Sequence, residues 1–262
     1  MNNIAHLICS KNFSGIEQHV HELTSTLTNN SDYDLYIFAD KTLEPHFQNQ
    51  RFQIFPNKFR FNLFALFKLR KLIKDHKIQI LHCHGSKSIL LGRWVSWITK
   101  VELIATVHAN KKRPVATNGF RKTIVVNELL KKTYPAAEVI GNWVNPKLEI
   151  LNSSRDGNFI AVGRLEKIKR FDLLINAWKG IDEKLEIIGD GLEKNNLLTI
   201  IKDNNLADQI TIRSEVNSQE LGNIYRRAKG LIITSSREGG PRVALEAAAF
   251  NLPVFGTNVG IM

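Results

Sequence analysis

The sequence predicts an α/β protein made of two doubly wound parallel-sheet domains, and three observations predict this class. Short apolar runs alternate with amphipathic stretches of helical period along the whole chain, which is typical of parallel sheets joined by crossover helices. A segment rich in Pro, Asn and Ser, residues 145–157, divides this pattern in two. A chain of 262 residues is long enough for two modest domains. We therefore expect a first domain at 1–150 and a second at 151–262.

Each predicted strand is a short apolar run, often β-branched, and each predicted helix repeats its apolar residues every three or four positions. In the first half we expect strands at Ile4–Cys9, Asp34–Ala39, Ile78–His82, Glu102–Val107 and Lys122–Val126, and helices at Ile16–Thr28, Leu63–Lys74, Ser86–Thr99 and Glu128–Tyr134. In the second half we expect strands at Phe159–Val162, Leu185–Ile188, Ile210–Arg213, Leu231–Thr234 and Val254–Gly256, and helices at Arg170–Trp178, Glu193–Asn204, Ser218–Arg227 and Arg242–Phe250.

The composition is that of an ordinary globular protein, with 43% hydrophobic and 23% charged residues. The two cysteines, Cys9 and Cys83, lie in apolar strand-like runs, which favours buried free thiols in a reducing compartment. No apolar run approaches the roughly 20 residues of a membrane-spanning helix, and the N-terminus has no signal-peptide pattern. We expect a cytoplasmic protein.

The net charge of +11 suits nucleic acid, an anionic membrane surface or a phosphorylated ligand. The chain contains no recognisable nucleic-acid-binding module, so we expect no nucleic-acid partner. Residues 58–77 are densely basic, with Asp75 as their only acid and apolar residues at helical spacing. This segment is either an amphipathic helix that contacts anionic lipid or a surface helix that covers a sheet with its lysines in water.

Residues 230–247 predict an anion site. A buried strand runs into a glycine turn, and a helix then begins at Pro241, where proline costs no hydrogen bond. The free N–H groups and positive dipole end of a helix start favour phosphate. Glu238 and Glu246 flank this start, and carboxylates accept hydrogen bonds from sugar hydroxyls. Amides for phosphate beside carboxylates for hydroxyls are what a nucleotide sugar requires.

A second basic element follows the predicted strand at 159–162, which ends in Gly163-Arg164, with Lys169 five residues later. Arginine binds two phosphate oxygens at once and lysine supplies a mobile point charge, so the pair could neutralise a diphosphate. Two alternatives remain open. The cations could be a solvated pair beside a helix start, and the two glutamates could be the acid/base pair of a hydrolase.

These motifs together resemble the retaining glycosyltransferases of family 4. The resemblance rests on Gly163-Arg164-Leu165 with Lys169, on Ile187-Ile188-Gly189-Asp190-Gly191, and on Glu238 and Glu246 followed by Asn251-Leu252-Pro253-Val254. It runs from about Ile4 to Gly260 and implies the GT-B architecture of two Rossmann-like domains. It further implies transfer of a sugar from a nucleoside-diphosphate sugar, with no metal or other cofactor, in lipopolysaccharide or surface-polysaccharide synthesis.

The resemblance also implies roles for particular residues. Those expected to be catalytic are His108, Arg164, Lys169 and Glu238. Those expected to bind the donor are Gly15, Arg164, Lys169, Val216, Glu238, Gly240, Arg242, Val243 and Glu246. Glu246 would accept from the ribose and Glu238 from the transferred sugar, while amides near Arg242 hold a phosphate and Val216 lies beside the base. His82 and His84 match a strand end of the family, in a structural or acceptor-side role, although a metal ligand set is conceivable there.

The chain departs from the family pattern at its end, because family members continue beyond the segment that matches residues 258–260 and this chain stops at Met262. We therefore expect an incomplete second domain. An alternative function follows from this, a truncated inactive remnant or a non-catalytic nucleotide-sugar-binding module of the same fold. Because many family members use lipid-linked acceptors, the resemblance favours a peripheral position on the inner face of the cell membrane.

Overall fold

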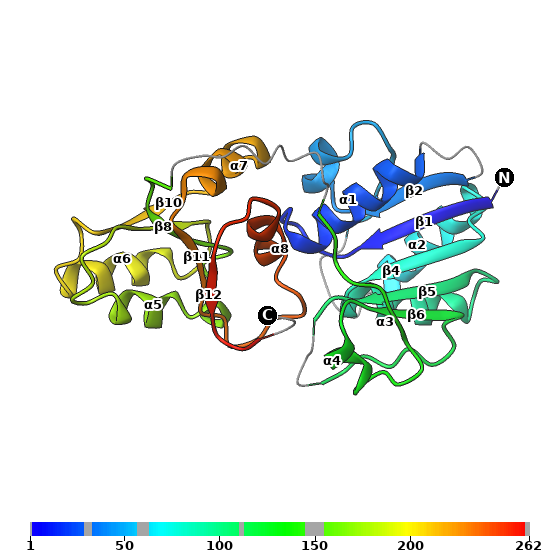
Figure 1. The fold of residues 1–262 in the computed structure, drawn as a ribbon. Coiled ribbons are helices and arrows are strands. Elements are labelled where there is room, and N and C mark those ends of the chain that lie inside the picture. The colour runs from blue at the N-terminus through cyan, green and yellow to red at the C-terminus, as the bar shows by residue number, and fades with distance from the viewer. Residues whose placement is uncertain (1, 29–32, 57–62, 110–112, 145–154, 260–262) are drawn as a thin grey trace. The chain divides into compact units, whose positions relative to one another are not determined.

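The computed structural model describes residues 2–28, 33–56, 63–109, 113–144 and 155–259. The chain forms two compact units, Met1–Asn142 and Trp143–Met262, each of which is an α/β unit (Figure 1). The predicted domain boundary at 150/151 and most of the predicted linker lie outside the described residues, so both stay predictions. No helix among the described residues is long and apolar enough to cross a bilayer.

The first unit is built on a seven-stranded sheet in the order β3-β2-β1-β4-β5-β6-β7. All neighbouring strands are parallel, as the pattern of short strands and crossover helices predicts. Its strands are β1 Asn2–Ile8, β2 Tyr33–Ala39, β3 Arg51–Ile54, β4 Ile80–His84, β5 Glu102–Val107, β6 Lys122–Val125 and β7 Glu138–Val139. Its helices are α1 Gly15–Thr28, α2 Leu63–Asp75, α3 Ser86–Ser96 and α4 Glu128–Lys131, with a 3₁₀ turn η1 at Lys41–His46.

Side chains on the two faces of this sheet enter different cores. Leu7 of β1 and Leu81 of β4 pack with Leu69 of α2 and Val95 of α3 in the larger core. On the opposite face, Ile8, Val20 of α1 and residues of β2 and η1 form a smaller apolar cluster. Because side chains alternate along a strand, β1 and β4 also direct His6, His82 and His84 to this second face.

The second unit contains a five-stranded parallel sheet in the order β10-β9-β8-β11-β12. Its strands are β8 Phe159–Val162, β9 Leu185–Ile188, β10 Ile210–Arg213, β11 Gly230–Ile233 and β12 Val254–Gly256. Its helices are α5 Phe171–Ala177, α6 Lys194–Asp203, α7 Ser218–Arg227 and α8 Arg242–Ala249, with a 3₁₀ turn η2 at Lys167–Lys169.

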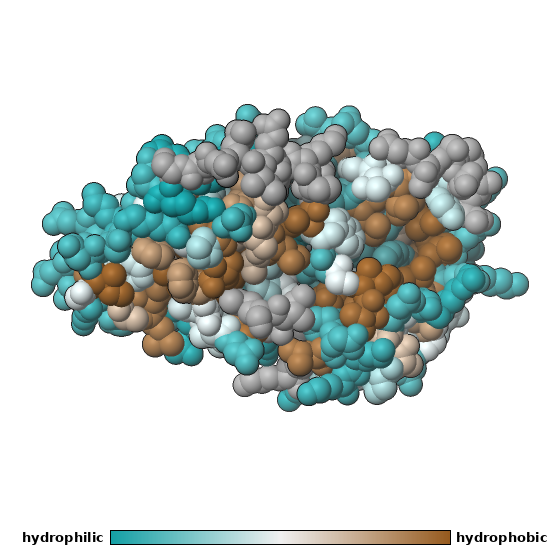
Figure 2. All heavy atoms as spheres, in the orientation of Figure 1, coloured by the Kyte–Doolittle hydropathy of each residue, from teal (hydrophilic) through white to brown (hydrophobic). Residues whose placement is uncertain are grey.

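Helices cover both faces of this second sheet, as a doubly wound fold requires. Phe171 of α5 and Leu197 of α6 pack on one face, while Tyr225 of α7 and Ala247 of α8 pack on the other. Figure 2 shows hydrophilic residues with scattered hydrophobic ones between them around α5 and α6, which is usual for the solvent side of covering helices. The predicted fold class, α/β with parallel sheets, is confirmed.

The strands that the sequence analysis missed are short. Strands β3 and β7 are the two outer strands of the seven-stranded sheet, and they have four and two residues. No residue of β3 is buried, because an edge strand has one neighbour and is less covered. Strands of two to four residues are too short for a hydrophobic period to reveal them.

Helix α2 spans residues 63–75 of the basic segment predicted at 58–77, of which residues 58–62 lie outside the described residues. Ala65, Leu69 and Ile73 are buried against the sheet, so the helix does cover the core. Leu63 and Phe67 are nevertheless 73% and 57% exposed. The helix therefore has an apolar inner face and, at its N-terminal end, exposed hydrophobic side chains.

Candidate active site

The order of strands in the second sheet brings two predicted loops together. Strand β8 lies between β9 and β11, so the chain moves outward in opposite directions on either side of it. Ligands of doubly wound sheets bind at such a point, beyond the carboxyl ends of the strands. The loop after β8 carries Gly163, Arg164 and Lys169, and the loop after β11 carries Glu238 and Gly240.

Hydrogen bonds tie these two loops to each other. The Thr234 hydroxyl donates to the Lys169 carbonyl at 2.8 Å, and the Ser236 amide donates to the Ile168 carbonyl at 2.9 Å. Both bonds join main-chain atoms of the η2 turn to the segment that leaves β11. The side chains on the two loops are therefore carried on a connected backbone.

The central contact of the site is an ion pair between Lys169 and Glu238, whose Nζ and Oε1 atoms lie 2.6 Å apart. The two side chains are only 19% and 16% exposed, so solvent screens this pair less than a surface pair. The buried hydroxyl of Ser235 donates to the same Oε1 at 2.6 Å. An ammonium and a carboxylate thus lie side by side, a suitable arrangement for a ligand with both negative oxygens and hydroxyl groups.

Glycines let the neighbouring turns approach closely. Gly163 has φ +154°, and a Cβ there would lie 3.1 Å from Lys169 Cε. A Cβ on Gly189 would lie 2.1 Å from the Gly163 carbonyl oxygen, and one on Gly191 2.5 Å from the Leu165 carbonyl oxygen. The glycines of the 187–191 motif therefore serve packing, because they let the turn after β9 lie against the turn that carries Arg164 and Lys169.

Arg164 and Val216 make other contacts. The exposed Arg164 guanidinium donates to Glu166 Oε1 at 2.8 Å. Val216 follows β10 and packs partly buried against the core of α7 and α8. Its loop is anchored because the Glu215 amide donates to Asp190 at 3.2 Å. A hydrogen bond from Lys194 lowers the pKa of the Asp190 carboxyl, so this anchor stays ionised and accepting.

Helix α8 begins at Arg242, after the N-cap residue Pro241, which makes no side-chain cap hydrogen bond. The first amides of the helix, those of Arg242 and Val243, thus follow a residue whose side chain has no acceptor. The Arg242 side chain is mostly buried, and its Nε lies 4.0 Å from Glu246 Oε1. The predicted amides and the predicted carboxylate are therefore in the same first two turns of one helix.

Tyr225 of α7 is a site residue that the sequence analysis missed. Its hydroxyl donates to Glu246 Oε2 at 2.9 Å, and its side chain is 1% exposed. Burial, followed by the neighbouring Glu246 charge, raises the pKa of Tyr225 well above its ordinary value. The phenol therefore stays protonated and orients the carboxylate. A tyrosine at an apolar helical position gives no sequence signal for this role.

In the first unit, Gly15 begins α1, and Glu17 in its first turn accepts from Ser14 just before it, which is one half of a capping box. The Glu17 carboxylate accepts from the Ser14 amide at 2.9 Å and from the Ser14 hydroxyl at 2.7 Å, and it also accepts from the Ser10 hydroxyl. The Ser-x-x-Glu spacing of residues 14–17 is the usual sequence signal for this motif, and the sequence analysis overlooked it. The loop between β1 and α1, which includes Gly15, is thereby held by a buried carboxylate.

His108 follows β5 and lies in a layer of histidines between the sheet and α1. His84 Nδ1 is 3.3 Å from His108 Nε2, and His6 Nδ1 is 3.1 Å from His84 Nε2. His82 Nε2 bonds the Thr106 hydroxyl at 2.7 Å, and the His19 ring lies 4.8 Å from the His108 ring. Burial lowers the pKa of His6 to about 3. It also lowers the pKa values of His82 and His84 well below the ordinary range.

Two groups of three histidines have ligand atoms close enough for a metal ion, all within 4.8 Å of one another. They are His6, His82 and His84, and His19, His84 and His108. Imidazole suits zinc, but neither group contains a carboxylate or thiolate to balance a divalent charge in this buried layer. Cys83 packs in the core on the opposite face of the sheet.

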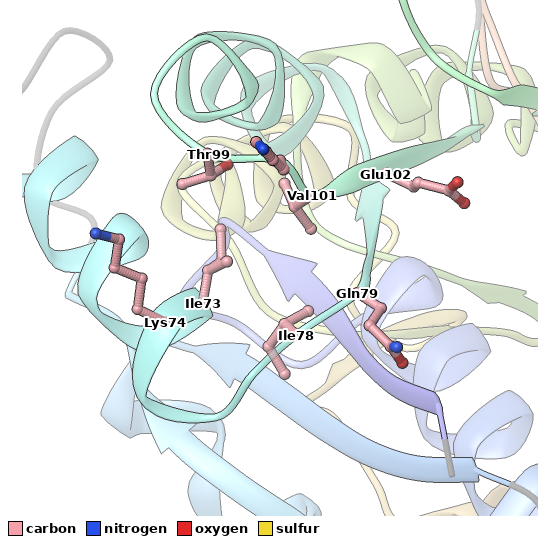
Figure 3. A pocket seen from close by; sticks show the side chains of 8 residues that line it. Ile73, Lys74, Ile78, Gln79, Thr99, Val101 and Glu102 are labelled. Atoms are coloured by element: carbon pink, nitrogen blue, oxygen red, sulfur yellow. The ribbon is translucent and has the colours of Figure 1, made fainter.

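A hollow of about 470 Å³ lies elsewhere in the first unit (Figure 3). Its walls include Ile73, Ile78 and Val101, with Lys74 and Glu102 also among its lining residues. It lies at the amino ends of β4 and β5, whereas ligands of doubly wound sheets bind at the carboxyl ends. We assign it no part in the site.

Two α/β units with parallel sheets, the second with a cation and a carboxylate paired on the loops after β8 and β11, are typical of the GT-B glycosyltransferase class. The family model for glycosyltransferase family 4 matches residues 13–140, and the model for glycosyl transferases group 1 matches residues 148–262. The chain belongs to these glycosyltransferases, so the family predicted from its motifs is confirmed.

Individual relatives agree with this assignment. The chain is 27% identical to the amylovoran biosynthesis glycosyltransferase AmsD of Erwinia amylovora, over 92% of this chain and 76% of that protein. It is 29% identical to an uncharacterized glycosyltransferase of Methanocaldococcus jannaschii, over 94% of this chain and 76% of that protein.

Solved structures have the same fold. Anabaena HepE in complex with UDP and glucose matches with a TM-score of 0.84 at 16% identity, over 99% of this chain and 82% of that one. The lipopolysaccharide outer core galactosyltransferase WaaB matches with a TM-score of 0.75 at 17% identity, over 100% of this chain and 82% of that one. The predicted GT-B fold is thereby confirmed.

Proposed function

We propose that this glycosyltransferase is a retaining enzyme that transfers a sugar from a nucleoside-diphosphate sugar, with UDP-sugars as the first donors to test. The observation that carries the proposal is the ion pair of Lys169 and Glu238, largely removed from water and joined by Ser235. An anionic donor can take Lys169 as its counter-ion while its sugar hydroxyls donate to Glu238. The complexes of HepE with UDP and glucose and with UDP-glucose support a uridine donor.

In this proposal the protein stabilises charge on the leaving diphosphate and supplies no covalent nucleophile. Lys169, Arg164 and the first amides of α8 at Arg242 and Val243 would bind the phosphates. For Arg164 this requires exchange of its present partner Glu166 for a phosphate, which an exposed side chain can do. A phosphate oxygen of the donor would take the proton of the acceptor hydroxyl. The hydroxyl oxygen would attack the sugar carbon on the face from which the diphosphate departs.

The other donor contacts belong to the sugars and the base. Glu246, oriented by Tyr225, would accept from the ribose, and Glu238 from the transferred sugar. Val216 would lie beside the base, and Gly240 would let the backbone approach the donor. In the first unit, Gly15 and His108 would contact the phosphates and the transferred sugar. We propose no metal and no cofactor other than the donor itself.

The proposed acceptor is a growing surface polysaccharide or lipopolysaccharide. The names of two similar proteins support this, the amylovoran biosynthesis enzyme and the lipopolysaccharide galactosyltransferase. We also propose a cytoplasmic, peripheral position at an anionic membrane, to bring the enzyme to a lipid-linked acceptor. The exposed Leu63, Phe64 and Phe67 on the basic helix α2 support this position.

Calorimetric titration of the full chain with UDP-, GDP- and ADP-sugars tests the donor proposal. We expect saturable heat with one nucleotide class, and loss of affinity in Lys169→Met but not in Lys167→Met. Lys167 lies in the same 3₁₀ turn and is exposed, so it controls for net charge. The anomeric configuration of the first sugar released, followed by proton NMR, tests retention. A folded chain that binds none of these donors would contradict the proposal.

A further inference from the structure

Five of the eight histidines of the chain lie in one layer between the first sheet and α1, namely His6, His19, His82, His84 and His108. A layer between a parallel sheet and a covering helix is normally apolar. Here α1 contributes His19, and β1 and β4 contribute three histidines that are at most 8% exposed. Buried polar groups need hydrogen-bond partners, so the partners of these rings are informative.

Three of the rings form a chain that leads from the interior to His108. His6 Nδ1 contacts His84 Nε2 at 3.1 Å, and His84 Nδ1 contacts His108 Nε2 at 3.3 Å. Both ring nitrogens of His84 thus contact a neighbouring histidine ring. The sheet brings these residues together, because β4 lies between β1 and β5 and His84 is in register with Ile8 and Thr106.

For three neutral rings, these contacts allow only two arrangements of hydrogen. Burial keeps His6 and His84 uncharged near neutral pH, and a neutral imidazole has one N–H and one lone pair. Each contact needs one of each. Either all three rings carry hydrogen on Nδ1, with His6 donating to His84 and His84 to His108, or all three carry it on Nε2 and every donor is reversed.

The surroundings of His6, at the inner end of this row of three rings, favour one arrangement. Among the described residues, His6 Nε2 has no hydrogen-bond partner, and the side chain is 1% exposed. The Nε2 arrangement would leave a buried N–H without an acceptor at this atom, whereas the Nδ1 arrangement would leave only a lone pair. Buried N–H groups without an acceptor are the rarer case in folded proteins.

We propose that His6 and His84 are positioning residues that hold His108 as its Nδ1–H tautomer, with His108 Nε2 occupied by His84. His108 then presents a hydrogen-bond donor at Nδ1, which suits an oxygen of the sugar or its acceptor. This last step rests on the proposed function, in which His108 contacts the donor. The tautomer itself does not depend on it.

NMR of the full chain labelled with ¹⁵N-histidine tests the proposal without a ligand. Two-bond proton–nitrogen spectra distinguish the two tautomers, and His108→Asn identifies the His108 signals by their loss. We expect His108 mainly as Nδ1–H in the wild-type protein. Predominant Nε2–H, or an even mixture, overturns the proposal.

Variants then test the role of His84. In His84→Gln the side-chain amide can still reach His6 but no longer contacts His108. The ratio of Nδ1–H to Nε2–H tautomer at His108 should therefore fall by about fivefold or more. His82→Gln is the matched control, because His82 is also buried and its ring centroid lies 4.2 Å from that of His84, but it bonds Thr106 instead. An unchanged ratio in a folded His84→Gln protein overturns the proposal.

Kinetics separate this inference from the proposed function. We expect kcat of His84→Gln to fall by about 10- to 100-fold with the donor KM unchanged, by analogy with other partners that orient a functional histidine. If the tautomer shifts as expected and no donor binds even the wild-type chain, the proposed function fails and the histidine chain stands. If donors bind and the tautomer is not Nδ1–H, the reverse holds.

Discussion

The ammonium of Lys169 lies 2.6 Å from Oε1 of Glu238, although 69 residues separate the two in the sequence. Strand order creates this contact, because β8 and β11 are neighbours in the sheet and their following loops meet. Ser235 holds the same oxygen from within the second loop. The candidate site of the second unit is therefore centred on a charge pair with defined geometry.

Removal of the Lys169 charge should slow transfer. Lys169→Ala should lower kcat by about 10²- to 10³-fold, the usual loss when one preorganised group that stabilises developing charge is deleted. Steady-state kinetics with the donor found by calorimetry measures this. Lys167→Ala removes a charge from the same turn and should change kcat little. Unchanged turnover in a folded Lys169→Ala protein would exclude the assigned role.

Gly163→Ala should displace the Lys169 side chain. The new Cβ would lie 3.1 Å from Lys169 Cε and 3.3 Å from its Nζ, at φ +154°. We expect loss of about 1–3 kcal/mol of unfolding free energy from backbone strain, together with weaker donor binding. Gly180→Ala is the control, because Gly180 also has positive φ but nothing within 4 Å. Only Gly163→Ala should reduce donor affinity in calorimetry; equal affinity in both variants would contradict the packing argument.

Tyr225→Phe should weaken nucleotide binding without loss of fold. It deletes the hydroxyl that donates to Glu246 at 2.9 Å and preserves the buried ring. One hydrogen bond has a net value of about 0.5–1.5 kcal/mol, so we expect the Kd for the free nucleotide to rise about 2- to 12-fold. Tyr36→Phe removes a hydroxyl of the first unit, which accepts from Arg51, and should leave the Kd unchanged.

Acid should destabilise the first unit. Burial lowers the pKa of His6 from 6.5 to about 3, so below pH 6.5 the unfolded chain binds a proton at this residue that the folded chain does not. The stability contributed by neutral His6 is therefore complete above pH 6.5 and is lost as the pH falls towards 3, by about 1.4 kcal/mol per pH unit. His82 and His84 act in the same direction.

Urea unfolding between pH 7.5 and 5 measures this slope. His6→Phe should reduce this slope by up to one proton. A free energy of unfolding that is flat or rises as the pH falls through this range would contradict the neutral, buried state of the histidine layer.

The exposed hydrophobic end of α2 should contribute to membrane binding. Double substitution Phe64→Ser with Phe67→Ser should weaken binding to vesicles that contain phosphatidylglycerol by at least about tenfold, since burial of one such side chain contributes about 1.5–3 kcal/mol. Vesicle flotation measures this, with neutral phosphatidylcholine vesicles as the charge control. Leu192→Ser removes a leucine of the second unit that is 96% exposed and should have no effect. Equal vesicle binding by all variants would mean that α2 only covers the sheet and does not contribute to membrane binding.

Local sequence pattern was sufficient for most of the fold. The five strands of the second sheet and its four helices were predicted with their ends within one residue, because apolar runs, Gly and Pro report directly on backbone conformation and burial. Edge strands β3 and β7 were not, because two to four residues are too few to establish a hydrophobic pattern. The candidate site residues Gly163, Lys169, Glu238 and Glu246 were also singled out from the sequence, since each stands in a local motif.

By itself the sequence determined the class of fold, the succession of elements and the motif residues, since all of these follow from neighbours along the chain. Tertiary structure alone decided which side chains meet. The pairing of Lys169 with Glu238, the bond from Tyr225 to Glu246 and the contact of His6 with His84, 78 residues apart, arise between segments that approach only after the sheets assemble. Strand order sets these contacts, and strand order is the outcome of burying every hydrophobic face at once.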